Sequence, residues 1–88
     1  MDEALKKLRE EIDSADEAII TALSKRMQAV KKVGKLKAAH NIPPLDQARW
    51  QKVLESKKSL AKSLNLSENL VHELYETIHK HALELEKK

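Results

Sequence analysis

Apolar residues recur along the first forty positions with the period of an α-helix. At about 100° per residue they fall on one stripe, whose members are Leu5, Leu8, Ile12, Ala15, Ile19, Leu23, Val30 and Val33. The only residue between Asp2 and His40 that disfavours a helix is Gly34, which costs roughly 1 kcal/mol relative to alanine. The pattern predicts one unbroken helix over residues 2–40.

Two positions on this stripe hold cations. By the same helical arithmetic, Arg26 and Lys37 project within about 20° of Leu8 and Ile19. Charged side chains are almost never fully buried unless they are paired. The stripe therefore predicts an anionic partner for Arg26 and Lys37.

Two shorter helices are expected after the first. Asn41-Ile42-Pro43-Pro44 ends the first helix, because a residue before proline is pushed out of the helical region. The second helix is expected from Leu45 to about Leu64, with Arg49 among the apolar residues Leu45, Val53, Leu60 and Leu64. Ser67 is expected to cap the third, whose apolar side is Leu70, Val71, Leu74, Tyr75, Ile78, Ala82 and Leu85. The prediction is an all-α fold of three helices in a single domain, residues 1–88.

The first helix is too long for the other two to cover. About 39 residues rising about 1.5 Å each make a rod near 58 Å. A second face of the helix carries Ile20 and Met27 together with Arg9 and Asp16. A wide apolar surface on an over-long helix predicts a homodimer. A coiled-coil tether is the alternative, but the stripe drifts too widely for a strict heptad seam.

Composition narrows the possible partners and the compartment. Seventeen Lys and Arg against fourteen Asp and Glu give a net charge of +3, and the basic residues are interleaved with acids. That mixture argues against nucleic-acid binding. No apolar run is long enough for a membrane and no leader pattern is present. With no cysteine, the chain is expected to be cytoplasmic.

Four cations lie on or beside apolar faces: Arg9, Arg26, Lys37 and Arg49. Any one could be a snorkelling side chain or half of an ion pair. Four together favour an anion-binding pocket, because clustered like charges repel one another. Arginine supplies paired donors that match carboxylates, and lysine supplies a compact charge. A small polyanion held between helices is the predicted ligand.

The usual catalytic constellations are missing. The chain has no cysteine and no serine in a glycine-flanked turn, so nucleophilic catalysis lacks support. His72, His79 and His81 lack the spacing of a helical zinc site, and surface or edge positions are predicted for them. Neither a metal nor a cofactor is expected. An enzyme of this kind would act by positioning and electrostatic preorganisation.

Motifs spread over nearly the whole chain resemble the all-helical chorismate mutases. They are Leu8-Arg9-Glu10-Glu11-Ile12-Asp13 with Asp16, Lys25-Arg26, Gly34-Lys35-Leu36-Lys37, and Asp46 with Arg49. The resemblance implies an intertwined helical homodimer of the shikimate pathway, acting in aromatic amino acid biosynthesis. It also implies a Claisen rearrangement of chorismate to prephenate, which needs no acid, base, nucleophile or cofactor.

Site roles follow from the resemblance alone. Arg9 of the neighbouring subunit and Arg26 would clamp the two substrate carboxylates. Lys37 would contact a carboxylate and the ether oxygen on which negative charge develops. Arg49 would add positive potential, and Asp46 would lie near the ring hydroxyl.

Three positions depart from the family pattern. Trp50 stands where the family often has a glutamate that contacts the ring hydroxyl, and Ala82 where it often has a hydroxyl. Glu86 stands where glutamine commonly donates to the ether oxygen. We expect Glu86 to assist only when protonated, so that the rate rises toward acid pH. Alternatively, Glu86 frays into solvent near the C-terminus.

Other functions stay open on sequence grounds. Trp50 keeps isochorismate-pyruvate lyase and aminodeoxychorismate mutase as alternatives, because its position helps to read the ring substituent. A non-catalytic helical dimerisation or regulatory module, or a fragment of a larger fused enzyme, is the alternative from a different class.

Overall fold

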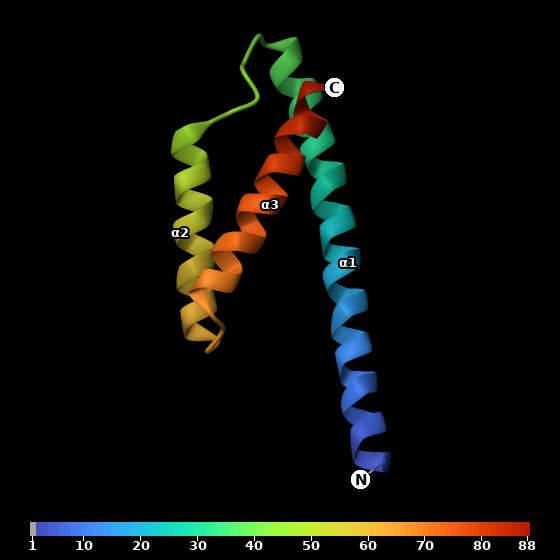
Figure 1. Cartoon of the computed structure of the whole chain (residues 1–88). Coiled ribbons are helices and arrows are strands. Elements are labelled where there is room, and N and C mark those ends of the chain that lie inside the picture. Colours follow the sequence, from blue (N-terminus) through green and yellow to red (C-terminus); the bar gives the residue numbers. More distant parts are fainter. Residues whose placement is uncertain (1) are drawn as a thin grey trace.

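The computed structural model describes residues 2–88, which form three helices. These are α1 (Asp2–Ala39), α2 (Gln47–Ser63) and α3 (Glu68–Lys87), and no strand occurs among the described residues. The predicted all-α fold of one long and two shorter helices is confirmed. Figure 1 shows the elongated shape, which measures 59 × 23 × 15 Å along its principal axes.

Helices α1 and α2 are terminated in the same way, by an asparagine two residues after the last helical residue. Asn41 and Asn65 both have φ of 56°, in the left-handed region that asparagine tolerates better than most residues. The next amide bonds back to the final turn in each case, from Ile42 to the Lys37 carbonyl and from Leu66 to the Ala61 carbonyl, both at 2.8 Å. Asparagine, rather than proline alone, therefore terminates α1.

Side-chain caps define where α2 and α3 begin. The Asp46 carboxylate accepts a hydrogen bond from the Arg49 amide at 3.0 Å, and the Ser67 hydroxyl accepts one from the Leu70 amide at 3.1 Å. The predicted cap at Ser67 is confirmed. Asp46 is the cap of α2 rather than part of it, so the predicted start at Leu45 is two residues early.

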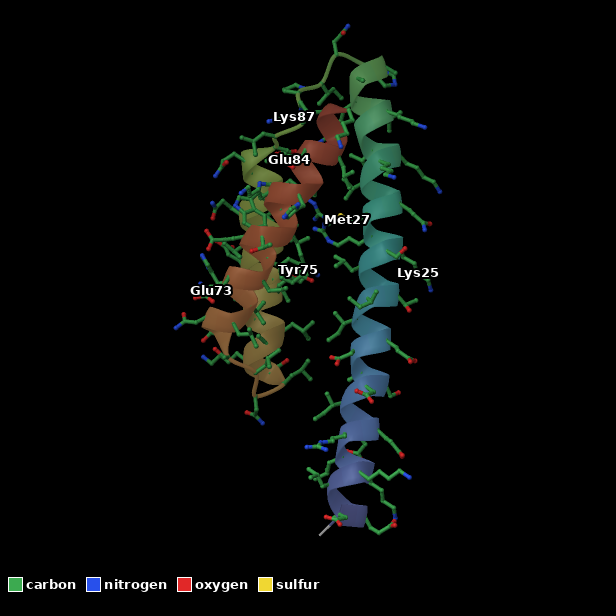
Figure 2. All side chains as sticks on the ribbon, turned by 45° about the vertical axis from the view of Figure 1, so that its right-hand side comes forward. Lys25, Met27, Glu73, Tyr75, Glu84 and Lys87 are labelled. Carbon is green, nitrogen blue, oxygen red and sulfur yellow. The ribbon has the colours of Figure 1, made fainter. Side chains whose placement is uncertain are left out.

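Helix α3 holds the molecule together. It packs against both α1 and α2, whereas α1 and α2 do not pack on each other within residues 2–88. Figure 1 shows α3 crossing from the lower end of α2 to the C-terminal end of α1. Figure 2 shows Met27 and Tyr75 on facing sides of α1 and α3, with Lys25 and Glu73 directed outward.

Gly34 is buried where α3 crosses α1. A Cβ atom there would lie 2.8 Å from Glu86 Cα and 3.1 Å from its carbonyl oxygen, closer than real Cβ atoms approach backbone. The glycine thus offsets its low helix propensity by letting the two backbones meet.

The core of the chain is small. Its buried apolar residues are Leu54, Ala61, Val71 and Ala82. The predicted apolar face of α2 is wrong in part, because Leu45, Leu60 and Leu64 are exposed. On α3, Leu70 and Leu74 are also exposed. One neighbouring helix covers only a narrow strip of an apolar face, and each of these faces is wider than that strip.

The N-terminal half of α1 has no neighbouring helix among the described residues, 2–88. Figure 1 shows it extending beyond the other helices. Its large apolar residues are between 42% and 64% exposed, namely Leu5, Leu8, Ile12, Ile19 and Ile20. The predicted mismatch in helix length is therefore present. Over residues 2–88, no helix combines the length and apolarity needed to cross a membrane.

Candidate active site

The C-terminal half of α1 brings Arg26 to the inner side of the molecule. Its guanidinium lies 5.9 Å from the centroid of the Tyr75 ring on α3, a cation–π contact. The Nη1 atom is buried and has no hydrogen-bond partner among residues 2–88. A buried donor without a partner costs about 1–3 kcal/mol, and an anionic ligand would remove that cost.

Lys37 lies three turns further along α1 and contacts the last turn of α3. Its Nζ atom is 2.8 Å from Glu86 Oε1 and donates to the Pro44 carbonyl at 2.7 Å. Glu86 Oε1 is itself buried beside this ammonium. Because the Glu86 side chain is only 11% exposed, the alternative that Glu86 frays into solvent is wrong.

The start of α2 contributes three more residues to the same region. Asp46 caps the helix by accepting from the Arg49 amide, so one of its oxygens already has a structural role. Arg49 and Trp50 follow in the first turn and also line the cavity. Arg49 is exposed and Trp50 is half-buried.

Trp50 stacks on His79 of α3. The two ring centroids are 3.9 Å apart and the rings are within 8° of parallel. Burial lowers the pKa of His79 from its usual 6.5, as does the positive charge of Arg26, while Glu86 acts in the opposite direction. His79 is half-buried in the pocket wall, which fits the edge position predicted for it, but its place beside the predicted site residues was not predicted. His79 lies four residues after Tyr75 and three before Ala82, so helical spacing places it on the inner face of α3. That spacing is the sequence signal from which its position could have been predicted.

These side chains surround one cavity between the three helices, of about 650 Å³ including its open mouth. The lining residues are Arg26, Val30, Val33, Lys37, Pro44, Asp46, Arg49, Trp50, Val53, His79, Ala82, Leu83 and Glu86. Cations outnumber anions in this lining, so the cavity favours an anionic ligand.

The structure brings together five of the six predicted site residues: Arg26, Lys37, Asp46, Arg49 and Glu86. The sixth, Arg9, lies in the N-terminal half of α1, beside a separate shallow hollow with Leu5 and Asp13. A single chain does not bring Arg9 to the cavity. Sequence reasoning also missed His79 as a lining residue.

The described residues offer no obvious metal centre. No group of three or more histidine, aspartate or glutamate side chains within residues 2–88 is placed to hold an ion. The chemistry open to this cavity is binding and electrostatic stabilisation of an anion, by two guanidinium groups and one ammonium group against an aromatic and aliphatic wall.

The fold and the cavity define a class of small all-helical proteins with a cationic interhelical pocket. Residues 8–87 match the model of the family described as chorismate mutase type II. The chain belongs to this family.

Curated relatives are longer proteins. The chain is 36% identical over 72 residues to the T-protein of Haemophilus influenzae, covering 82% of this chain and 19% of the relative. It is 36% identical over 90 aligned positions to the bifunctional chorismate mutase/prephenate dehydratase of Aquifex aeolicus, covering 98% and 25%. A T-protein of Enterobacter agglomerans is 31% identical over 67 residues, covering 76% and 18%. The chain thus spans about a fifth to a quarter of the length of these relatives.

Proposed function

We propose that this chain catalyses the rearrangement of chorismate to prephenate. The single observation that carries the proposal is the convergence of Arg26, Lys37 and Arg49 on one cavity, with a buried Arg26 nitrogen that has no hydrogen-bond partner within residues 2–88. Chorismate carries two carboxylates, and its rearrangement breaks one C–O bond and forms one C–C bond within the same molecule. Membership of the chorismate mutase type II family supports the same reaction.

The proposed mechanism is differential binding. Arg26 holds a substrate carboxylate with paired donors. The Lys37 ammonium donates to the ether oxygen, where negative charge grows as the C–O bond lengthens, so its contact strengthens in the transition state. Lys37 is paired with Glu86 in the free chain. Substrate therefore has to share or displace that contact. Arg49 adds positive potential, and Asp46 contacts the ring hydroxyl through its free oxygen.

The proposed active unit is a homodimer of this helical domain, residues 1–88. A second copy covers the exposed apolar residues of the N-terminal half of α1 and supplies its own Arg9 to the cavity. Support comes from the uncovered stripe and from the distance along α1 that separates Arg9 from the cavity lining. We propose a cytoplasmic location, since the substrate is a soluble metabolite and the chain contains no cysteine.

A second candidate is a related reaction on the same scaffold, either isochorismate-pyruvate lyase or aminodeoxychorismate mutase. Trp50 keeps it open, because an indole, which offers no acceptor, stands where the family often has a glutamate that contacts the ring hydroxyl. A non-catalytic helical dimer is the candidate from a different class.

The test assays purified wild type with chorismate, isochorismate and aminodeoxychorismate in parallel. Conversion of chorismate to prephenate is expected to be fastest. Faster turnover of either other substrate would establish the second candidate instead. Stable dimers with no turnover of any of the three would establish the non-catalytic module.

Arg26→Ala makes the assay specific to the cavity. Removing one preorganised donor is expected to lower kcat/KM by about 10²–10³-fold, with an unchanged helical circular dichroism spectrum, because Arg26 Nη1 has no hydrogen-bond partner among residues 2–88. Lys25→Ala is the matched control, since Lys25 is exposed and points outward on the same turn (Figure 2). Unfolding of Arg26→Ala would instead make Arg26 a structural residue.

A further inference from the structure

His79 occupies a fixed place in the cavity wall. It comes from α3 and stacks on Trp50 of α2 with centroids 3.9 Å apart. Near-parallel stacking covers one face of the imidazole and fixes the plane of the ring. The hydrogen bonds of the imidazole nitrogens run in the plane of the ring, and a ring stacked on its face does not block that direction.

Among residues 2–88, no side-chain hydrogen bond and no ion pair involves His79. His72 on the same helix differs, since its Nε2 lies 3.2 Å from Glu76 Oε1. A neutral imidazole offers one donor and one acceptor, and a protonated imidazole offers two donors.

Burial, together with the charge of Arg26, favours the neutral form of His79 while the cavity is empty. Arg26 and Lys37 face the cavity from α1, Arg49 and the capping Asp46 from α2, and Glu86 from α3. Burial and Arg26 lower the pKa of His79, and Glu86 only partly opposes them. A ligand with two carboxylates would add negative charge beside Arg26 and so act to raise the pKa of His79, against the lowering by burial.

We propose that His79 is a further substrate-binding residue, which takes up a proton from solvent as a dicarboxylate enters the cavity and then donates a hydrogen bond to it. This inference rests on the proposed function for the nature of the ligand. His79 is then positively charged only when the anionic ligand is bound. In the empty cavity, neutral His79 does not increase the repulsion among Arg26, Lys37 and Arg49. The reaction itself needs no proton, so the effect falls on binding. Affinity is then expected to rise as pH falls, by at most about tenfold per pH unit for one proton.

Calorimetric titration of the protein with prephenate, the stable dicarboxylate product, measures the proton directly. Titrations at pH 7 in two buffers of different ionisation enthalpy give the number of protons taken up per site. Wild type is expected to take up a measurable fraction of one proton. His79→Phe retains an aromatic ring against Trp50 and is expected to take up clearly less. His81→Phe is the matched control, because His81 is exposed on the same helix, and is expected to equal wild type.

Glu86 is the other group near the ligand that could bind the proton. In Glu86→Gln, uptake is expected to persist. Uptake that vanishes there and persists in His79→Phe overturns the inference, as does zero uptake in wild type that converts chorismate. In both cases the proposed function stands. No binding of prephenate together with no turnover of chorismate overturns the inference and the proposed function together.

Discussion

The two halves of α1 carry the same apolar stripe in different surroundings. In the N-terminal half, Leu8 and Ile12 are more than half exposed. In the C-terminal half, α3 lies against the helix, Gly34 is buried, and Arg26 and Lys37 face a cavity. The stripe therefore indicates that one face of α1 has to be buried against another surface. It does not say which surface, because that depends on where α2 and α3 pack.

The two halves of α1 differ in charge as well as in burial. Arg26 and Lys37 interrupt the stripe only where α3 and α2 can build a pocket around them. In the N-terminal half the stripe stays apolar, and Arg9 lies on a different face. This division suits one half of α1 to assembly and the other to chemistry.

The largest effect is expected from a charge in the uncovered half. Ile12→Lys should prevent assembly, because burying an unpaired ammonium in an apolar interface costs several kcal/mol. It should also abolish turnover, since Arg9 of a second copy would no longer reach the cavity. Sedimentation and chorismate turnover measure the two consequences. Ser14→Lys is the matched control, since Ser14 lies about 160° away on the same helix and is exposed. A dimeric, active Ile12→Lys protein would show that this half does not assemble through its stripe.

In the covered half, Gly34→Ala is expected to destabilise the fold. The new Cβ would meet the backbone of Glu86 at 2.8 Å, and overpacking typically costs about 1–3 kcal/mol. The sign is informative by itself, because the same change at an open helical site stabilises by about 1 kcal/mol. Urea unfolding measures it. Increased stability would mean that α3 does not press on α1 at this point.

The same comparison shows what a sequence can predict here. Helix periodicity is local, so the three helices and the cap at Ser67 were predictable. The burial of Leu54 and Ala61 in place of Leu60 and Leu64 depends on how α3 crosses α2, which no local pattern contains.

The site residues were likewise predictable from the sequence only in part. Arg26 and Lys37 were found because they violate the stripe, and Arg49 by its helical spacing. His79 was missed because a histidine on an amphipathic helix carries no comparable violation. Its partner Trp50 lies 29 positions earlier, so only the tertiary fold brings the two rings together.

A smaller effect is expected where the covered half meets the end of α3. Only a protonated Glu86 can donate to the ether oxygen, so kcat of wild type should rise as pH falls, by up to about tenfold per pH unit. Glu86→Gln donates at every pH and should flatten that profile. Measuring kcat for chorismate at saturating substrate separates this effect from changes in binding. Glu84→Gln is the control, since Glu84 is exposed on the same turn. Identical profiles for wild type and Glu86→Gln would remove Glu86 from the mechanism.

The smallest effect concerns the stability of the covered half against pH. The pKa of His79 is lower in the folded chain than its usual 6.5, so the unfolded chain binds the proton more readily. Stability is then fully present above about pH 6.5 and is lost as pH falls from there through the folded pKa. His79→Phe keeps an aromatic ring against Trp50 and lacks the proton site. Its free energy of unfolding should therefore fall less than that of wild type between pH 7.5 and pH 5.5, in urea titrations at one protein concentration. His81→Phe, altered at an exposed histidine of the same helix, should follow wild type. An equal decrease in the free energy of unfolding of wild type and His79→Phe would mean that folding does not lower the pKa of His79.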